Sequence, residues 1–198
     1  MTQREVDADH VYAFAMRGWL TEESLDRAGR KKRIDTRLHG DETVSKALSL
    51  SLFDTELVVR AQRMALVYTA ISAFENSVRE LVSDVLADET GEDWWAKSVS
   101  EKIRVKAESR MKEEELYRWH TPRGNRPLNF TDFGELASII QQNWARFEPY
   151  MQSVSWVDNI FKTLERSRNV IMHSGELDQQ DVERIGIHIR DWVKQVGA

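Results

Sequence analysis

The apolar side chains between residues 57 and 85 recur at steps of three and four. This spacing predicts a single long helix of about eight turns, from roughly Leu52 to Leu86, which Thr90 and Gly91 end. Glu75 falls on the same stripe, and a carboxylate on a core-facing stripe requires a partner. The apolar members of the stripe are Leu57, Met64, Val67, Tyr68, Ile71, Phe74, Val78, Leu81, Val82 and Val85.

Helical periodicity continues along the middle of the chain. A mostly charged helix is predicted from roughly Ser100 to Trp119, and the Pro-, Gly- and Asn-rich residues 120–127 predict a loop. Thr131 is expected to cap the next helix, which Pro149 interrupts. The apolar faces are Val99, Ile103 and Ala107 in the first helix, and Phe133, Leu136, Ile139, Ile140 and Trp144 in the second.

Two more helices are predicted before the C-terminus. The first runs from about Ser155 to His173 and stops at Gly175, and residues 178–181 cap the second. Residues 1–50 indicate shorter helices of weaker periodicity. The apolar face of the last helix consists of Val182, Ile185, Ile189, Trp192 and Val196, and a basic run near the N-terminus consists of Arg27, Arg30, Lys31, Lys32, Arg33 and Arg37.

The fold class predicted from these segments is all-α, a helical bundle of four to five long helices with shorter N-terminal helices. We expect residues 1–45 to form an N-terminal helical extension, a candidate partner-binding arm, and residues 46–198 to form the main helical domain.

Composition excludes several classes of protein. The absence of cysteine excludes disulfides and thiolate metal sites, and with five scattered histidines we expect no metal and no cofactor. The net charge of −5 argues against nucleic-acid binding over the whole surface. With no signal peptide and no apolar run of roughly 20 residues, we expect a cytoplasmic protein with no membrane partner.

Sequence period and residue chemistry disagree near residue 170. The apolar stripe that reaches Leu164 continues into Arg168, so an arginine occupies a core-facing position. Asn169 and His173 lie one turn apart, with Glu165 one turn below. Such disagreements tend to mark functional sites. A structural explanation stays open, because the helix dipole favours a C-terminal histidine and an arginine can extend from the edge of a core.

Residues 168–173, which read RNVIMH, resemble the signature of the HEPN superfamily, a group of small helical nucleotide-binding and ribonuclease domains. One branch is especially similar, that of the C-terminal domain of a eukaryotic mRNA-quality-control endonuclease and its stand-alone bacterial relatives. The resemblance covers roughly residues 50–195. It extends to AFENSVRE at 73–80, GEDWW at 91–95, YRWH at 117–120, FTDFGEL at 130–136 and NWARFE at 143–148.

The resemblance implies metal-independent RNA cleavage by a homodimer, with the Arg/His pairs of two copies at a shared cleft. Arg168 would hold the scissile phosphate, and His173 would exchange protons with the 2′-OH or the leaving oxygen. Asn169 would orient the imidazole or contact a phosphate oxygen. Glu75 would either support Arg168 or form a structural ion pair with Arg79 or another cation.

The family setting indicates phage defence or a toxin-like role. The alternative is a catalytically silent HEPN domain that binds RNA or a protein partner from a neighbouring gene. The basic stretch around residues 97–126 could follow a phosphate backbone, and its aromatic residues could stack on bases. A solvated face balanced by glutamates, with Trp119 in the core, is the other interpretation. The predicted RNA-contacting residues are Arg118, Trp119, His120, Arg123 and Arg126.

Overall fold

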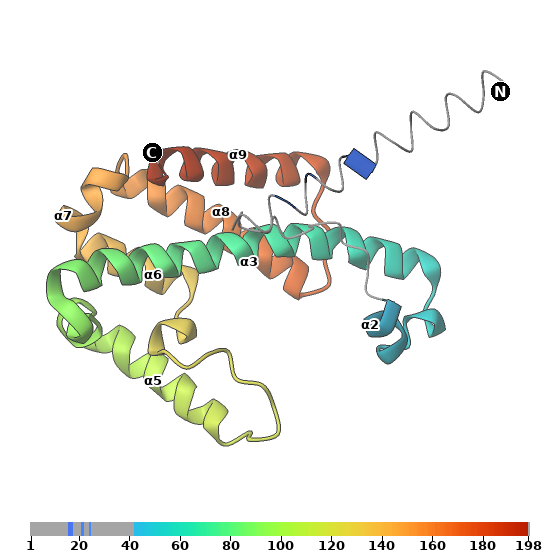
Figure 1. Ribbon diagram of the computed structural model, residues 1–198, viewed down its shortest axis with the longest axis horizontal. Helices are drawn as coiled ribbons and strands as arrows, with labels where there is room; N and C mark the ends of the chain where they lie inside the picture. Colours follow the sequence, from blue (N-terminus) through green and yellow to red (C-terminus); the bar gives the residue numbers. More distant parts are fainter. Residues whose placement is uncertain (1–15, 18–20, 22–23, 25–41, 198) are drawn as a thin grey trace. The chain divides into compact units, whose positions relative to one another are not determined.

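The computed structural model describes residues 16, 17, 21, 24 and 42–197, and the chain divides into two units between Phe53 and Asp54. Every regular element among these residues is a helix, which confirms the predicted all-α class (Figure 1). In the first unit the structure describes α2 (Glu42–Ala47) and a 3-10 helix (Leu50–Leu52). The predicted basic run at residues 27–37 lies outside the described residues, and the boundary at residue 45 stays a prediction.

The second unit is built on α3 (Thr55–Thr90). The Asp54 carboxylate accepts hydrogen bonds from the first backbone N–H groups of the helix, and Gly91, at a φ of 69°, ends it. The predicted long helix is thus confirmed, with its ends shifted by a few residues. Two members of the predicted stripe, Leu57 and Tyr68, are exposed, and Leu81 and Val85 are partly buried. The other six members are buried: Met64, Val67, Ile71, Phe74, Val78 and Val82.

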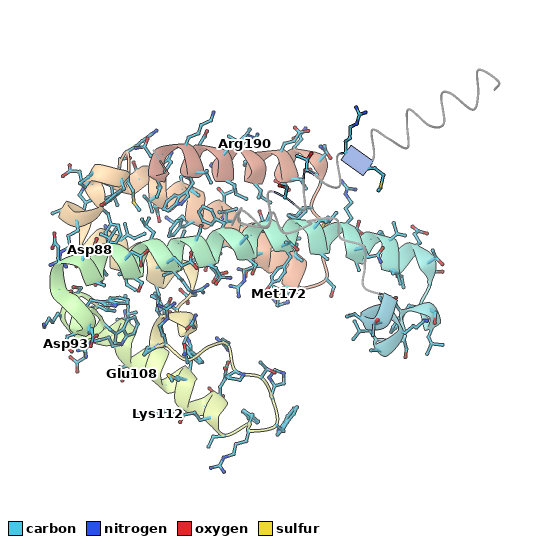
Figure 2. All side chains as sticks on the ribbon, in the orientation of Figure 1. Asp88, Asp93, Glu108, Lys112, Met172 and Arg190 are labelled. Atoms are coloured by element: carbon cyan, nitrogen blue, oxygen red, sulfur yellow. The ribbon has the colours of Figure 1, made fainter. Side chains whose placement is uncertain are left out.

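A short 3-10 turn (Gly91–Asp93) and α4 (Trp94–Ser98) connect α3 to α5 (Glu101–Glu115). The thin apolar stripe predicted for this region is buried: Val99, Ile103 and Ala107. Glu108 and Lys112 lie one turn apart on the charged face of α5 (Figure 2). The helix ends at Glu115, four residues before the predicted end at Trp119.

The helix α6 (Phe133–Gln142) follows a 3-10 turn (Pro127–Phe130). Its N-cap is Asp132, so the prediction that Thr131 caps it was wrong. The Asp132 carboxylate accepts from the Glu135 N–H at 2.8 Å, and the Glu135 carboxylate accepts from the Asp132 N–H at 3.1 Å, which forms a capping box. Thr131 instead donates its hydroxyl to the Leu128 carbonyl at 2.8 Å.

The break after α6 comes earlier than the one predicted at Pro149. Asn143 ends the helix, and its side-chain amide donates to the Ile139 carbonyl at 2.8 Å and to the Ser98 carbonyl at 2.9 Å. Because this amide ties the turn to the end of α4, the chain restarts as α7 (Trp144–Phe147) and a 3-10 turn (Glu148–Tyr150).

The helices α8 (Val154–Met172) and α9 (Gln179–Val196) complete the bundle and contact each other and α3 (Figure 1). Asp178 caps α9 by accepting from the Asp181 N–H at 2.8 Å, as predicted. An aromatic cluster forms the centre of the core, since Phe74 meets Phe161 at 5.9 Å and Trp192 at 5.2 Å between ring centroids. Within the described residues, no helix combines the length and hydropathy that crossing a bilayer requires.

Candidate active site

The C-terminal end of α8 is fixed by a Schellman motif. The Ser174 N–H donates to the Ile171 carbonyl at 2.9 Å, and the Gly175 N–H donates to the Val170 carbonyl at 2.8 Å. Ser174, at a φ of 61°, takes the left-handed position, one residue before the predicted stop at Gly175. Gly175 is needed for close approach, because a Cβ there would lie 2.8 Å from Val170 Cγ1 and 2.9 Å from the Val170 oxygen.

His173 is the residue that caps α8, and its backbone N–H donates to the Asn169 carbonyl at 3.1 Å. Its side chain is exposed, as is that of Asn169, and both lie on one face of the helix because they are four residues apart. Within the described part of the chain, the imidazole makes no hydrogen bond and no ion pair. The ring is therefore available to a ligand at the end of a rigid turn.

Arg168 turns toward α3 instead. Its Nε lies 3.9 Å from the Glu75 Oε2, and this nitrogen is buried without a hydrogen-bond partner among the described residues. The Arg168 side chain as a whole is 32% exposed, so atoms of this side chain other than Nε account for its exposed surface. Residues five apart on a helix point about 140° away from each other. No contact therefore joins Arg168 to His173.

Glu75 contacts both Arg79 and Arg168, the two partners considered for it from the sequence. It is 7% exposed on α3, and its Oε1 accepts a short hydrogen bond from Nη2 of Arg79. The same Nη2 donates to the Thr131 carbonyl at 2.9 Å, and the Arg79 Nη1 donates to Asn76 at 3.2 Å. Arg79 thus fixes the Glu75 carboxylate, and this carboxylate in turn faces Arg168.

Glu165 adds a second carboxylate beside Arg168. Burial, followed by the negative charge of Asp132, raises the pKa of Glu165, while the positive charge of Arg168 lowers it. The Asp132 carboxylate also lies 3.6 Å from Nη2 of Arg110. Sequence reasoning missed Asp132 and Thr131 as site residues, although both stand in the FTDFGEL block that carried part of the family resemblance.

The loop after α5 holds the predicted RNA-contacting residues. Trp119 is 83% exposed, so the interpretation that placed it in the core was wrong. Its ring meets the His120 ring edge-on at 5.5 Å, and Arg118 beside it is exposed. These residues form an aromatic and basic surface, but no described contact connects it with Arg168 or His173.

Several cations of the basic stretch have acidic partners. Nε of Arg123 lies 2.5 Å from Glu114, and the guanidinium sits 5.8 Å from the centroid of the Phe130 ring. Lys97 pairs with Asp93 at 3.6 Å, and Arg126 is exposed. Part of this stretch is therefore a balanced, solvated face. Among the residues that the structure describes, no cluster of His, Asp or Glu side chains is suited to hold a metal ion.

Comparison with known protein families shows which family the chain belongs to. The Swt1-like HEPN family matches residues 69–197, a range that contains Glu75, Arg168 and His173. The chain belongs to the Swt1-like HEPN family. The predicted superfamily is thereby confirmed, and HEPN domains of this type are generally associated with ribonucleases. Comparison with curated proteins and with solved structures found no match.

Proposed function

We propose that this HEPN domain is a metal-independent endoribonuclease that acts as a homodimer. The observation that carries the proposal is the end of α8, where Arg168 faces the buried Glu75 and His173 presents an exposed imidazole without a partner among the described residues. A guanidinium and a titratable ring are the two groups that cleavage of an RNA phosphodiester needs in the absence of a metal.

The reaction uses the nucleophile that RNA carries. The 2′ oxygen attacks phosphorus while its proton passes to a base, and the bond from phosphorus to the 5′ oxygen breaks as that oxygen takes a proton from an acid. The products are a 2′,3′-cyclic phosphate and a 5′-hydroxyl. An imidazole can serve as base or acid near neutral pH. In a homodimer, His173 of each copy could take one of these roles.

Arg168 would bind the non-bridging oxygens of the phosphate and stabilise the charge that develops on them. Glu75 and Arg79 are positioning residues in this scheme, because they hold the guanidinium without touching substrate. Asn169 shares its helix face with His173 and would orient the imidazole or bind the phosphate. Glu165, whose pKa is raised, lowers the negative charge near the phosphate when it is protonated.

A shared cleft between two copies fits the divergence of Arg168 and His173 within one protomer. The exposed Trp119, with Arg118 and His120 beside it, supports a role for the α5 loop in binding unpaired bases. We further propose that the activity serves phage defence or a toxin-like function. The cytoplasmic location stays a prediction.

The test is cleavage of a labelled single-stranded RNA in EDTA by the wild-type protein, Arg168→Ala and His173→Ala. Both variants should lose cleavage while keeping wild-type circular dichroism. His188→Ala, which removes a half-buried histidine from α9, serves as the control and should cleave normally. RNA binding without any cleavage by the wild-type protein would refute the nuclease proposal and favour a silent RNA- or partner-binding domain.

A further inference from the structure

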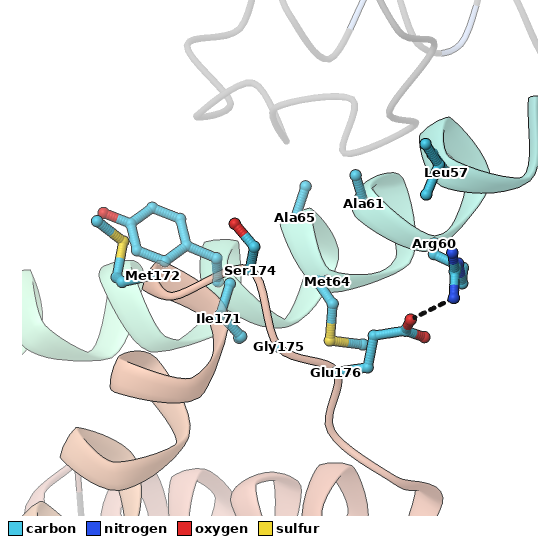
Figure 3. Close-up of a pocket in the computed structure, with 11 residues that line it drawn as sticks. Leu57, Arg60, Ala61, Met64, Ala65, Ile171, Met172, Ser174, Gly175 and Glu176 are labelled. Carbon is cyan, nitrogen blue, oxygen red and sulfur yellow. Dashed lines mark ion pairs between the residues drawn. The ribbon is translucent and has the colours of Figure 1, made fainter. Parts of the chain in front are cut away.

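An apolar pocket opens between the end of α8, at Met172, and the first turns of α3 (Figure 3). Its volume is about 530 Å³, within the range of pockets that hold small ligands. Met172 and Ser174, the two residues that flank His173, both line it. His173 itself does not line the pocket, so a group bound there would contact the residues before and after it in the chain.

The side of the pocket formed by α3 is lined by apolar and aromatic side chains, which suit a flat ring. Ala61 and Ala65 contribute small side chains to this side, and Leu57 contributes aliphatic surface at one end. Tyr68 adds an aromatic side chain that is 37% exposed, although it falls on the core stripe by its spacing. Aromatic and aliphatic surfaces of this kind are what an unstacked nucleobase requires.

The charged groups of the pocket form an ion pair, and Tyr68 and Ser174 add hydroxyl groups to the lining. Nη1 of Arg60 lies 3.3 Å from Oε1 of Glu176, and both side chains are nearly half exposed (Figure 3). The rim thus offers a carboxylate that accepts hydrogen bonds and, directly beside it, a guanidinium that donates them.

We propose that this pocket binds a guanine base of the RNA, next to the phosphate that is cleaved. The proposal rests on the function proposed above and names its base preference. Guanine is the base that places two N–H donors, N1–H and N2–H, side by side on its Watson–Crick edge, where the carboxylate of Glu176 can accept from both. Its O6 lies next to N1–H and accepts from the guanidinium of Arg60. Adenine, cytosine and uracil each lack part of this pattern.

The first experiment measures cleavage of oligoadenylate RNAs that carry a single guanosine, uridine or cytidine at one central position. The wild-type protein should cut next to the guanosine. Glu176→Gln should lower the preference for guanosine by about 10- to 100-fold, which is the discrimination that a two-point base contact supplies. The matched control is Glu89→Gln, which removes the exposed carboxylate that pairs with Arg146. Cleavage that ignores the base, or an unchanged preference in Glu176→Gln, would overturn the proposal.

The second experiment measures binding of guanosine 3′-monophosphate to the His173→Ala protein by titration calorimetry, so it needs no activity. Binding should persist in this variant, weaken in Glu176→Gln and weaken in Tyr68→Leu. Tyr150→Leu, at a tyrosine that is 41% exposed, is the control and should bind normally. If the wild-type protein cleaves no RNA, the nuclease proposal fails and this titration alone decides the pocket. Equal binding of adenosine and guanosine monophosphates would refute the guanine site.

Discussion

The buried carboxylate Glu75 should be coupled more strongly to Arg79 than to Arg168. Its Oε1 shares a hydrogen bond with Arg79, whose side chain is 12% exposed. Its Oε2 lies 3.9 Å from Nε of Arg168, whose side chain is 32% exposed. Arg79, which is buried and hydrogen-bonded to the Glu75 carboxylate, should be stabilised more by this charge than Arg168, which is farther away and partly solvated. The two coupling free energies should therefore differ in size.

The magnitudes follow from charge, distance and exposure. Two unit charges about 4 Å apart attract by about 4 kcal/mol at an effective dielectric constant of about 20. Desolvation and solvent screening offset part of this attraction. We expect a coupling free energy of about 2–3 kcal/mol for Glu75 with Arg79 and about 1 kcal/mol or less for Glu75 with Arg168. Glu75→Gln alone should cost about 3 kcal/mol of the free energy of unfolding, since Arg79 loses its counter-charge.

The assay is a pair of double-mutant cycles measured by urea denaturation, with Glu75→Gln, Arg79→Met, Arg168→Met and the two double variants. Cleavage by Glu75→Gln should also fall by about 10- to 100-fold, because a guanidinium released from its carboxylate is poorly placed. A larger coupling with Arg168 than with Arg79, or a Glu75–Arg79 coupling below about 0.5 kcal/mol, would refute this account of the site.

Three further changes test other parts of the structure by urea denaturation. Gly175→Ala should lower the free energy of unfolding by about 1–2 kcal/mol, because its Cβ would meet the Val170 carbonyl oxygen at 2.9 Å. Gly134→Ala, whose Cβ would make only an ordinary contact at 3.5 Å, should be neutral or stabilising. Equal effects of the two changes would contradict the Schellman geometry. Asp132→Ala should cost about 1 kcal/mol through the lost cap, and an unchanged midpoint would argue against the capping box. The folded state raises the pKa of Glu165 above 4.5, so the folded protein still holds a proton on this carboxyl at pH values where the unfolded chain has lost it. The free energy of unfolding therefore decreases as the pH rises from 4.5 through the raised pKa. Glu165→Gln should remove this decrease and be more stable than the wild-type protein at pH 7; a variant that is less stable there would contradict the assignment.

The long helices were predictable because their apolar stripes are also their buried faces. The cap of α6 was not placed correctly, since Thr131 and Asp132 both suit that position and the structure forms the capping box between Asp132 and Glu135. The Glu135 three residues after Asp132 was the readable signal of a capping box. The end of α5 was placed too late because Leu116 and Trp119 have helix-compatible side chains; they are 78% and 83% exposed, so no burial extends the helix.

At the candidate site, part of the contacts of Glu75 was predictable from the sequence, whereas the geometry was not. The position of Glu75 on an apolar stripe indicated a buried partner, and the structure supplies Arg79 with Arg168 beyond it. The carbonyl of Thr131 could not be predicted, because a backbone acceptor has no signature in the sequence. The pocket between the end of α8 and α3 was also not predicted, since Leu57 and Tyr68 have the spacing of core residues yet line a pocket.

The most direct measurement uses two RNAs of identical sequence, one entirely of ribonucleotides and one with a single 2′-deoxynucleotide at the cleavage position. Each is incubated with the wild-type protein in EDTA. We expect the all-ribose RNA to be cut to a 2′,3′-cyclic phosphate and a 5′-hydroxyl, the deoxy position to resist cleavage, and His173→Ala to cut neither RNA. An intact RNA, a cut at the deoxy position, or undiminished cleavage by His173→Ala would contradict the nuclease proposal.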